Sequence, residues 1–138
     1  MLKRILVAYD GSKSSEKAFS FAMELAIAFH ARITLLAVAQ LPEPATMVES
    51  SAMLDSATEH FAQGFERLQN NGRSRGIEVE TGVVVGHPAT QIVHRAAEVK
   101  SDLIVMGHRG HNPIKEWLLG STSKRVITYA PCSVTIVR

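Results

Sequence analysis

The stretch from Gly107 to Thr122 holds the residues whose types and spacing best fit anion binding. It reads GHRGHNPIKEWLLGST and follows the apolar run DLIVM, with glycines at 107, 110 and 120. Because a glycine has no Cβ, its backbone N–H groups can approach an anion closely. Behind Gly120, hydroxyl residues at 121 to 123 open an expected helix, whose free N–H groups and dipole attract negative charge. The stretch therefore predicts a phosphate-binding loop.

Charged and imidazole side chains of the same stretch allow further chemistry. Arg109 and Lys115 can add charge-assisted hydrogen bonds to a phosphate, or can simply point into solvent. His108 and His111 lie beside the loop, but neither has a cysteine or carboxylate partner at a spacing typical of zinc sites. We therefore expect no metal ion held by protein ligands.

Segments that alternate along the chain must position this loop. The expected strands are the apolar segments 4–9, 32–39, 77–85, 101–107 and 133–138. The expected helices have apolar residues at helical spacing and cover 14–30, 50–71, 88–99 and 121–129, the second ending before Gly72. Strict alternation of this kind predicts parallel strands joined by right-handed helical crossovers, with helices on both faces of one sheet. The fold class is therefore a doubly wound α/β fold, with the alternating segment 77–85 nearer an edge.

Composition and charge narrow the class of protein. The chain has 138 residues, of which 46% are hydrophobic and 20% charged, as in an ordinary globular protein, so we expect a single domain over 1–138. The formal net charge of +2 is scattered, which argues against nucleic-acid binding. No apolar run approaches membrane-spanning length, and the start lacks a signal-peptide core. A cytoplasmic protein that does not bind membranes is expected.

The topology also predicts where a ligand binds. In open α/β sheets, ligands lie outside the carboxyl ends of the strands, where neighbouring connections leave in opposite directions. We expect strands 4–9 and 101–107 to form the central pair, so Asp10 and Gly107 converge on this crevice. The stretch YDGSKSS after the first strand fits neither the P-loop pattern nor the Rossmann glycine pattern.

The glycine spacing resembles the nucleotide-binding signature of the universal stress protein family. Gly107, two residues, Gly110, nine residues, then Gly120 and Ser121 match that signature. ILVAYDGS, GHP, SDLIVMGHRG and APCSVTIVR are similar to the family in order and spacing over nearly the whole chain. The resemblance implies a five-stranded, flavodoxin-like (Rossmann-like) parallel sheet with strand order 3-2-1-4-5. Because the glycine signature is intact, it also implies membership of the ATP-binding branch.

The same resemblance implies roles for individual residues. Asp10 would approach the nucleoside, although it can also cap the following helix, and Val38 would meet the adenine through its backbone. Met106 and Gly107 would line the ribose and phosphate side. The residues expected to wrap the phosphates are Gly110, Gly120, Ser121 and Thr122.

The resemblance implies a regulatory ATP-binding protein of stress adaptation. We expect Mg²⁺ to be carried by the phosphates, because magnesium prefers oxygen ligands and retains water, and a homodimer to form through the C-terminal strand. One alternative is a slow ATP-hydrolysing or adenylating enzyme, but YDGSKSS departs from Ser-Gly-Gly-x-Asp-Ser and no base is evident, so no catalytic residue is predicted. The other is a nucleotide-free adaptor.

Overall fold

The strands form one parallel sheet whose order matches the expected one. The computed structural model describes residues 1–40, 46–108 and 120–138. Its strands are β1 (Arg4–Ala8), β2 (Arg32–Ala39), β3 (Val79–Val85), β4 (Leu103–Gly107) and β5 (Ser133–Val137). All neighbours pair in parallel, in the order β3-β2-β1-β4-β5. The predicted doubly wound sheet is thus confirmed, and β3 lies at an edge.

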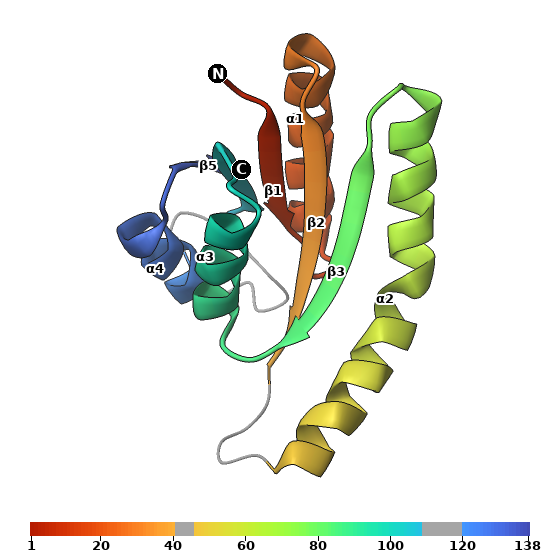
Figure 1. The fold of residues 1–138 in the computed structure, drawn as a ribbon, viewed down its shortest axis with the longest axis vertical. Coiled ribbons are helices and arrows are strands. Elements are labelled where there is room, and N and C mark those ends of the chain that lie inside the picture. The colour runs from red at the N-terminus through yellow and green to blue at the C-terminus, as the bar shows by residue number, and fades with distance from the viewer. Residues whose placement is uncertain (41–45, 109–119) are drawn as a thin grey trace.

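Helices cover both faces of this sheet (Figure 1). They are α1 (Lys13–Phe29), α2 (Met47–Ser74), α3 (Pro88–Glu98) and α4 (Ser121–Tyr129). Side chains alternate along β1, so Ile5 and Val7 pack in the core beneath α1 and α2, while Leu6 packs in the core beneath α3 and α4. Burial on both faces explains why β1 reads as a continuous apolar run.

The starts of α1 and α2 are fixed by capping. Ser12 caps α1, its Oγ accepting from the backbone N–H of Ser15 at 3.1 Å. Thr46 and Glu49 form a reciprocal capping box, with hydrogen bonds of 3.0 and 2.9 Å, so α2 begins three residues earlier than the expected residue 50. The first part of α2 then runs beyond the ends of β2 and β3 (Figure 1), where Met47 is 90% exposed.

The expectation that α2 ends before Gly72 is wrong. The helix passes through Gly72 and ends at Ser74. A Cβ on Gly72 would lie 2.5 Å from Cγ2 of Val79 and 2.9 Å from the carbonyl oxygen of Ile77. The absence of a side chain at Gly72 therefore lets β3 pack closely on the helix. The chain turns at Gly76 instead, where φ is 76°.

Asp102 ties the start of β4 to the start of β1. Its Oδ2 accepts the backbone N–H groups of Lys3 and Arg4 at 2.8 and 2.9 Å. These hydrogen bonds hold the pKa of the Asp102 carboxyl below its ordinary value of 3.8. Because the pKa is lower in the folded protein, the carboxylate stabilises the fold at neutral pH, and this contribution is lost as the pH falls below that value.

Asp102→Ala is expected to lower the free energy of unfolding at neutral pH by about 1 kcal/mol, a small value because the side chain is exposed and solvent weakens its hydrogen bonds. Urea unfolding of the parent and the variant at neutral pH and near pH 3 measures this. The difference between the two proteins should shrink at the lower pH. An equal difference at both pH values would show that the charge of Asp102 does not matter.

Candidate functional site

The place where the topology predicts a ligand is the carboxyl ends of β1 and β4. These strands pair directly, as the sequence predicts, and Val7 lies opposite Val105. β1 leads into α1 on one face of the sheet, and the next described helix after β4 is α4, which belongs to the other face (Figure 1). Connections that leave adjacent strands in opposite directions open a crevice at their carboxyl ends.

Asp10 is held in place at the end of β1. Its Oδ1 accepts the backbone N–H of Ser12 at 2.9 Å, and its own N–H lies 3.4 Å from Oγ of Ser15. Gly11 between them has a φ of 81°, which favours glycine. Asp10 therefore takes part in the turn that starts α1, and its half-buried carboxylate has a fixed position beside the crevice.

Gly107 has a packing role that the sequence analysis missed. It ends β4, and a Cβ there would collide with Oγ of Ser14 and lie 2.8 Å from the backbone carbon and oxygen of Ser14. Only a glycine lets the first turn of α1 lie so close to β4. This contact brings the turn after β1, which contains Asp10, next to the end of β4.

The side chains of Val38 and Met106 pack on the face of the sheet that α3 and α4 cover. Val38 is the second-last residue of β2, opposite Val84 of β3, and is half-buried. Met106 is 5% exposed and packs in the core cluster that contains Val126 of α4. Its side chain is occupied by packing, so the predicted contact of Met106 with a ligand can involve only its backbone.

The N-terminus of α4 has no side-chain cap among the described residues. Gly120 is its N-cap, and the helix has neither a side-chain capping bond nor an acidic residue in its first turn. A Cβ on Gly120 would meet nothing within 4 Å. Ser121 is exposed and Thr122 half-buried. The first N–H groups of a helix have no acceptor within it, so this end can accept an anion.

The remaining predicted contacts, Arg109 and Gly110, lie outside the described residues, as do Lys115 and His111. The described part of the chain thus places the turn that contains Asp10 next to Gly107, and it supplies no side-chain cap for the start of α4. It contains no group of three or more His, Cys, Asp or Glu side chains placed to hold a metal ion. None of its helices is long and apolar enough to span a membrane.

His108 is a residue whose environment the sequence analysis did not foresee. Its backbone N–H donates to the carbonyl of Val137 at 2.8 Å, extending the pairing of β4 with β5. The residue is 5% exposed, and its buried Nε2 has no hydrogen-bond partner among the residues that the structure describes. The sequence analysis considered His108 only as a metal ligand. The position of His108 directly after an apolar strand is the sequence feature that could have predicted its burial.

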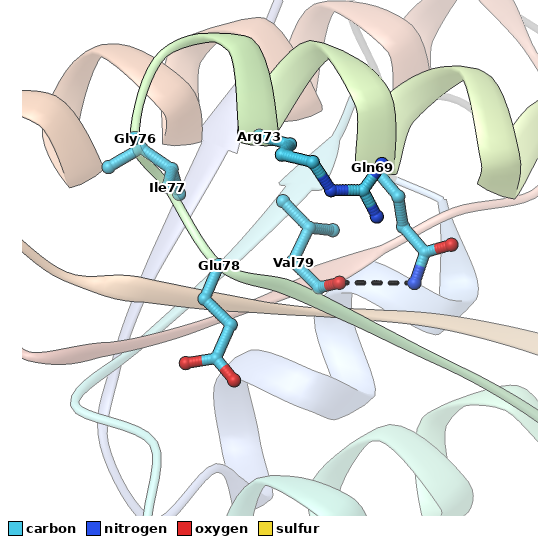
Figure 2. A pocket seen from close by; sticks show the side chains of 6 residues that line it. All are labelled: Gln69, Arg73, Gly76, Ile77, Glu78 and Val79. Carbon is cyan, nitrogen blue, oxygen red and sulfur yellow. Dashed lines mark hydrogen bonds between the residues drawn. The ribbon is translucent and has the colours of Figure 1, made fainter.

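A hollow lies where α2 ends and β3 begins (Figure 2). Gln69 crosses it and donates from Nε2 to the carbonyl of Val79 at 3.2 Å (Figure 2). Glu78 at its rim forms an ion pair with Arg32 at 3.1 Å. Because this hollow lies at the amino end of β3, it is not the site that the topology predicts. Its lining residues are Gln69, Arg73, Gly76, Ile77, Glu78 and Val79.

Comparison with known proteins identifies the family. The model of the universal stress protein family matches residues 1–138, so the chain belongs to this family. Universal stress protein YxiE of Bacillus subtilis is 34% identical over 150 residues, covering 100% of both chains. The structure of universal stress protein UspA from Lactobacillus plantarum superposes with a TM-score of 0.81 at 26% identity, covering 99% of this chain and 97% of the other. A universal stress protein in complex with cAMP has a TM-score of 0.76 at 26% identity, with the same coverage of 99% and 97%.

Proposed function

We propose that this protein, a single domain over residues 1–138, is a cytoplasmic ATP-binding regulator of stress adaptation. The observation that carries the proposal is the uncapped N-terminus of α4, preceded by Gly120 and free of acidic residues in its first turn. Such a helix end stabilises a phosphate through its N–H groups and its dipole. The related structure in complex with cAMP supports an adenine nucleotide as the ligand class.

The proposed pose places the nucleoside at the ends of β1 and β2 and the phosphates toward α4. Asp10 approaches the nucleoside, and the backbone of Val38 meets the adenine. The backbones of Met106 and Gly107 line the ribose and phosphate side. The residues proposed to contact the phosphates are Arg109, Gly110, Gly120, Ser121 and Thr122.

Mg²⁺ fits this arrangement when the phosphates themselves carry it. Magnesium takes oxygen ligands and retains several waters, so it does not require a cage of protein carboxylates. The described residues hold no three-ligand group for a metal, and the start of α4 supplies N–H groups and hydroxyls rather than carboxylates. We propose that the protein changes its partners with the state of the bound nucleotide and that any hydrolysis of ATP by the protein is slow.

The proposal is tested by releasing nucleotide from the purified protein with acid and identifying it by mass. Recovered ATP is the expected result. ADP or AMP would indicate turnover and favour the enzyme alternative. A protein that releases no nucleotide and binds none added at millimolar concentration would be a nucleotide-free adaptor, and the proposal would be wrong.

We also propose a homodimer that pairs β5 with the same strand of a second copy. β5 lies at the edge of the sheet. The carbonyl of Val137 faces β4, where it accepts from His108. Because backbone groups alternate in direction along a strand, the N–H and C=O of Ile136 face the open edge. Soluble proteins normally cover such an edge, and a symmetric strand pair would do so.

Ile136→Pro is expected to turn this dimer into a monomer. Proline removes the N–H that faces the edge and is tolerated on edge strands, so the fold should persist. Sedimentation at micromolar concentration, with circular dichroism as a check of folding, measures the effect. Val48→Ser, at a position 78% exposed on α2, is the control and should remain dimeric. A parent protein that sediments as a monomer would contradict the proposal.

A further inference from the structure

Helix α1 carries a row of large apolar side chains that its own chain leaves partly in water. Phe21, Leu25 and Phe29 follow one another at intervals of four residues, so they lie along one side of the helix. We call these three residues the α1 stripe. Phe21 is 37% exposed and Phe29 52% exposed, while Leu25 is half-buried against the core. Single exposed apolar residues are ordinary, but a contiguous apolar surface marks an interaction site.

The contacts of α1 show which way the stripe faces. Ser14 lies seven residues before Phe21 and so on the same side of the helix, and its backbone would be 2.8 Å from a Cβ on Gly107 of β4. On the other side, the Glu16 carboxylate accepts from Nη2 of Arg67 in α2 at 2.9 and 3.0 Å. The α1 stripe therefore faces away from α2, over β4 and toward the edge strand β5.

The side of β5 that borders the α1 stripe has no helix of its own among the described elements. Val137 packs against the core beneath α1, and side chains alternate along a strand, so Thr135 and Ser133 point to the same side. The other described helix on this face is α2, which lies beside β3 at the opposite edge of the sheet (Figure 1). The half-buried Val137 and Thr135 thus extend the surface that the α1 stripe begins.

We infer that the α1 stripe packs against a second copy of the chain, beside the paired β5 strands. The inference rests on the homodimer proposed above and adds a helix surface to it. An antiparallel pair of identical strands has its two-fold axis perpendicular to the sheet, so both α1 helices lie on one face of the joined sheet. With each α1 above β4, three strand spacings separate the two helices, about 14 Å. Packed helices are only about 8 to 10 Å apart, so large side chains such as Phe21 are needed to fill the space between them.

The size and charge of the two sheet edges favour a second copy at β5. A stable interface buries about 800 Å² on each partner, which is more than the edge of a five-residue strand supplies, so the dimer needs further surface. β5 has no charged residue from Ser133 to Val137. By contrast, β3 carries the exposed Glu80, and a symmetric pair through β3 would bring two such carboxylates into one interface.

The experiment measures the dissociation constant of the dimer by sedimentation over a range of protein concentrations. Phe21→Ser should raise this constant at least about 100-fold, because a symmetric dimer loses the side chain twice. Leu54→Ser is the matched control, since Leu54 is 38% exposed on α2, and should leave the constant within about threefold of the parent. Circular dichroism checks that each variant is folded. Where Phe21→Ser fails to fold, Phe29→Ser replaces it with the same expected loss.

Two results would overturn the inference while leaving the homodimer through β5 intact. One is a folded Phe21→Ser protein that dimerises as tightly as the parent, which would leave the α1 stripe to a different protein. The other is an equal weakening by Leu54→Ser, which would show that the loss does not depend on the α1 stripe. A parent protein that sediments as a monomer would instead refute the homodimer, and the inference with it. None of these results bears on ATP binding, which the release of nucleotide by acid tests separately.

Discussion

Gly120→Asp is expected to stabilise the unliganded protein slightly and to weaken ATP binding by roughly 10²- to 10⁴-fold. Gly120 has the backbone angles of an N-cap, φ −65° and ψ 158°, and a Cβ there meets nothing within 4 Å. Aspartate is a better N-cap than glycine by a few tenths of a kcal/mol. In the complex, its carboxylate would occupy N–H groups meant for phosphate and repel the phosphate charge. Losing two charge-assisted hydrogen bonds of about 1.5 to 3 kcal/mol each gives the expected loss.

Two matched variants separate the causes of this loss. Gly120→Asn caps the helix without a charge, and Gly120→Ala adds a Cβ without capping. Calorimetric titration should rank ATP affinity as parent and alanine above asparagine, with aspartate weakest, while thermal unfolding ranks aspartate and asparagine highest. Unchanged ATP affinity in Gly120→Asp would show that the start of α4 does not bind the phosphates.

Gly107→Ala is expected to lower the free energy of unfolding by about 2 to 3 kcal/mol and to abolish detectable ATP binding. The added Cβ would collide with the backbone of Ser14, which cannot move without shifting the first turn of α1. That turn also holds Asp10, through the N–H of Ser12. Both borders of the crevice would therefore move.

Urea unfolding and ATP titration check this second expectation. Gly120→Ala is the matched control, because the same substitution there meets open space and should change stability by less than about 1 kcal/mol. Equal stability of Gly107→Ala and the parent would mean that α1 adjusts to the Cβ without cost, and that the glycine is not needed for packing.

The fold could be predicted because its hydrophobic pattern is consistent along the chain. Apolar runs alternating with helical stripes specify parallel strands and crossovers, and the strand order implied by the family resemblance agrees with the structure. The ends of elements were harder, because they depend on local contacts. The stretch from Thr46 to Glu49 has the spacing of a capping box and could have fixed the start of α2. The packing of Gly72 on Val79 could not be read from the sequence, where a glycine equally indicates a helix end.

The proximity of Asp10 and Gly107 could be predicted for a different reason. Topology brings them together, since the carboxyl ends of adjacent parallel strands lie at the same edge of the sheet. The approach of Ser14 to Gly107 and the burial of His108 depend on how the helices pack on the sheet. The spacing of residues in the sequence does not give this packing. The glycine spacing predicted the loop as a phosphate site, and it gave no sign that Gly107 is also needed for packing.

Difference electron density from crystals grown with ATP and Mg²⁺ tests the central claim most directly. The claim predicts the adenosine at the carboxyl ends of β1 and β2, and the phosphates at the first turn of α4 beside Gly120. Density for the nucleotide elsewhere, such as in the hollow lined by Arg73 and Glu78 (Figure 2), would contradict it. So would crystals grown at millimolar ATP whose crevice holds no nucleotide.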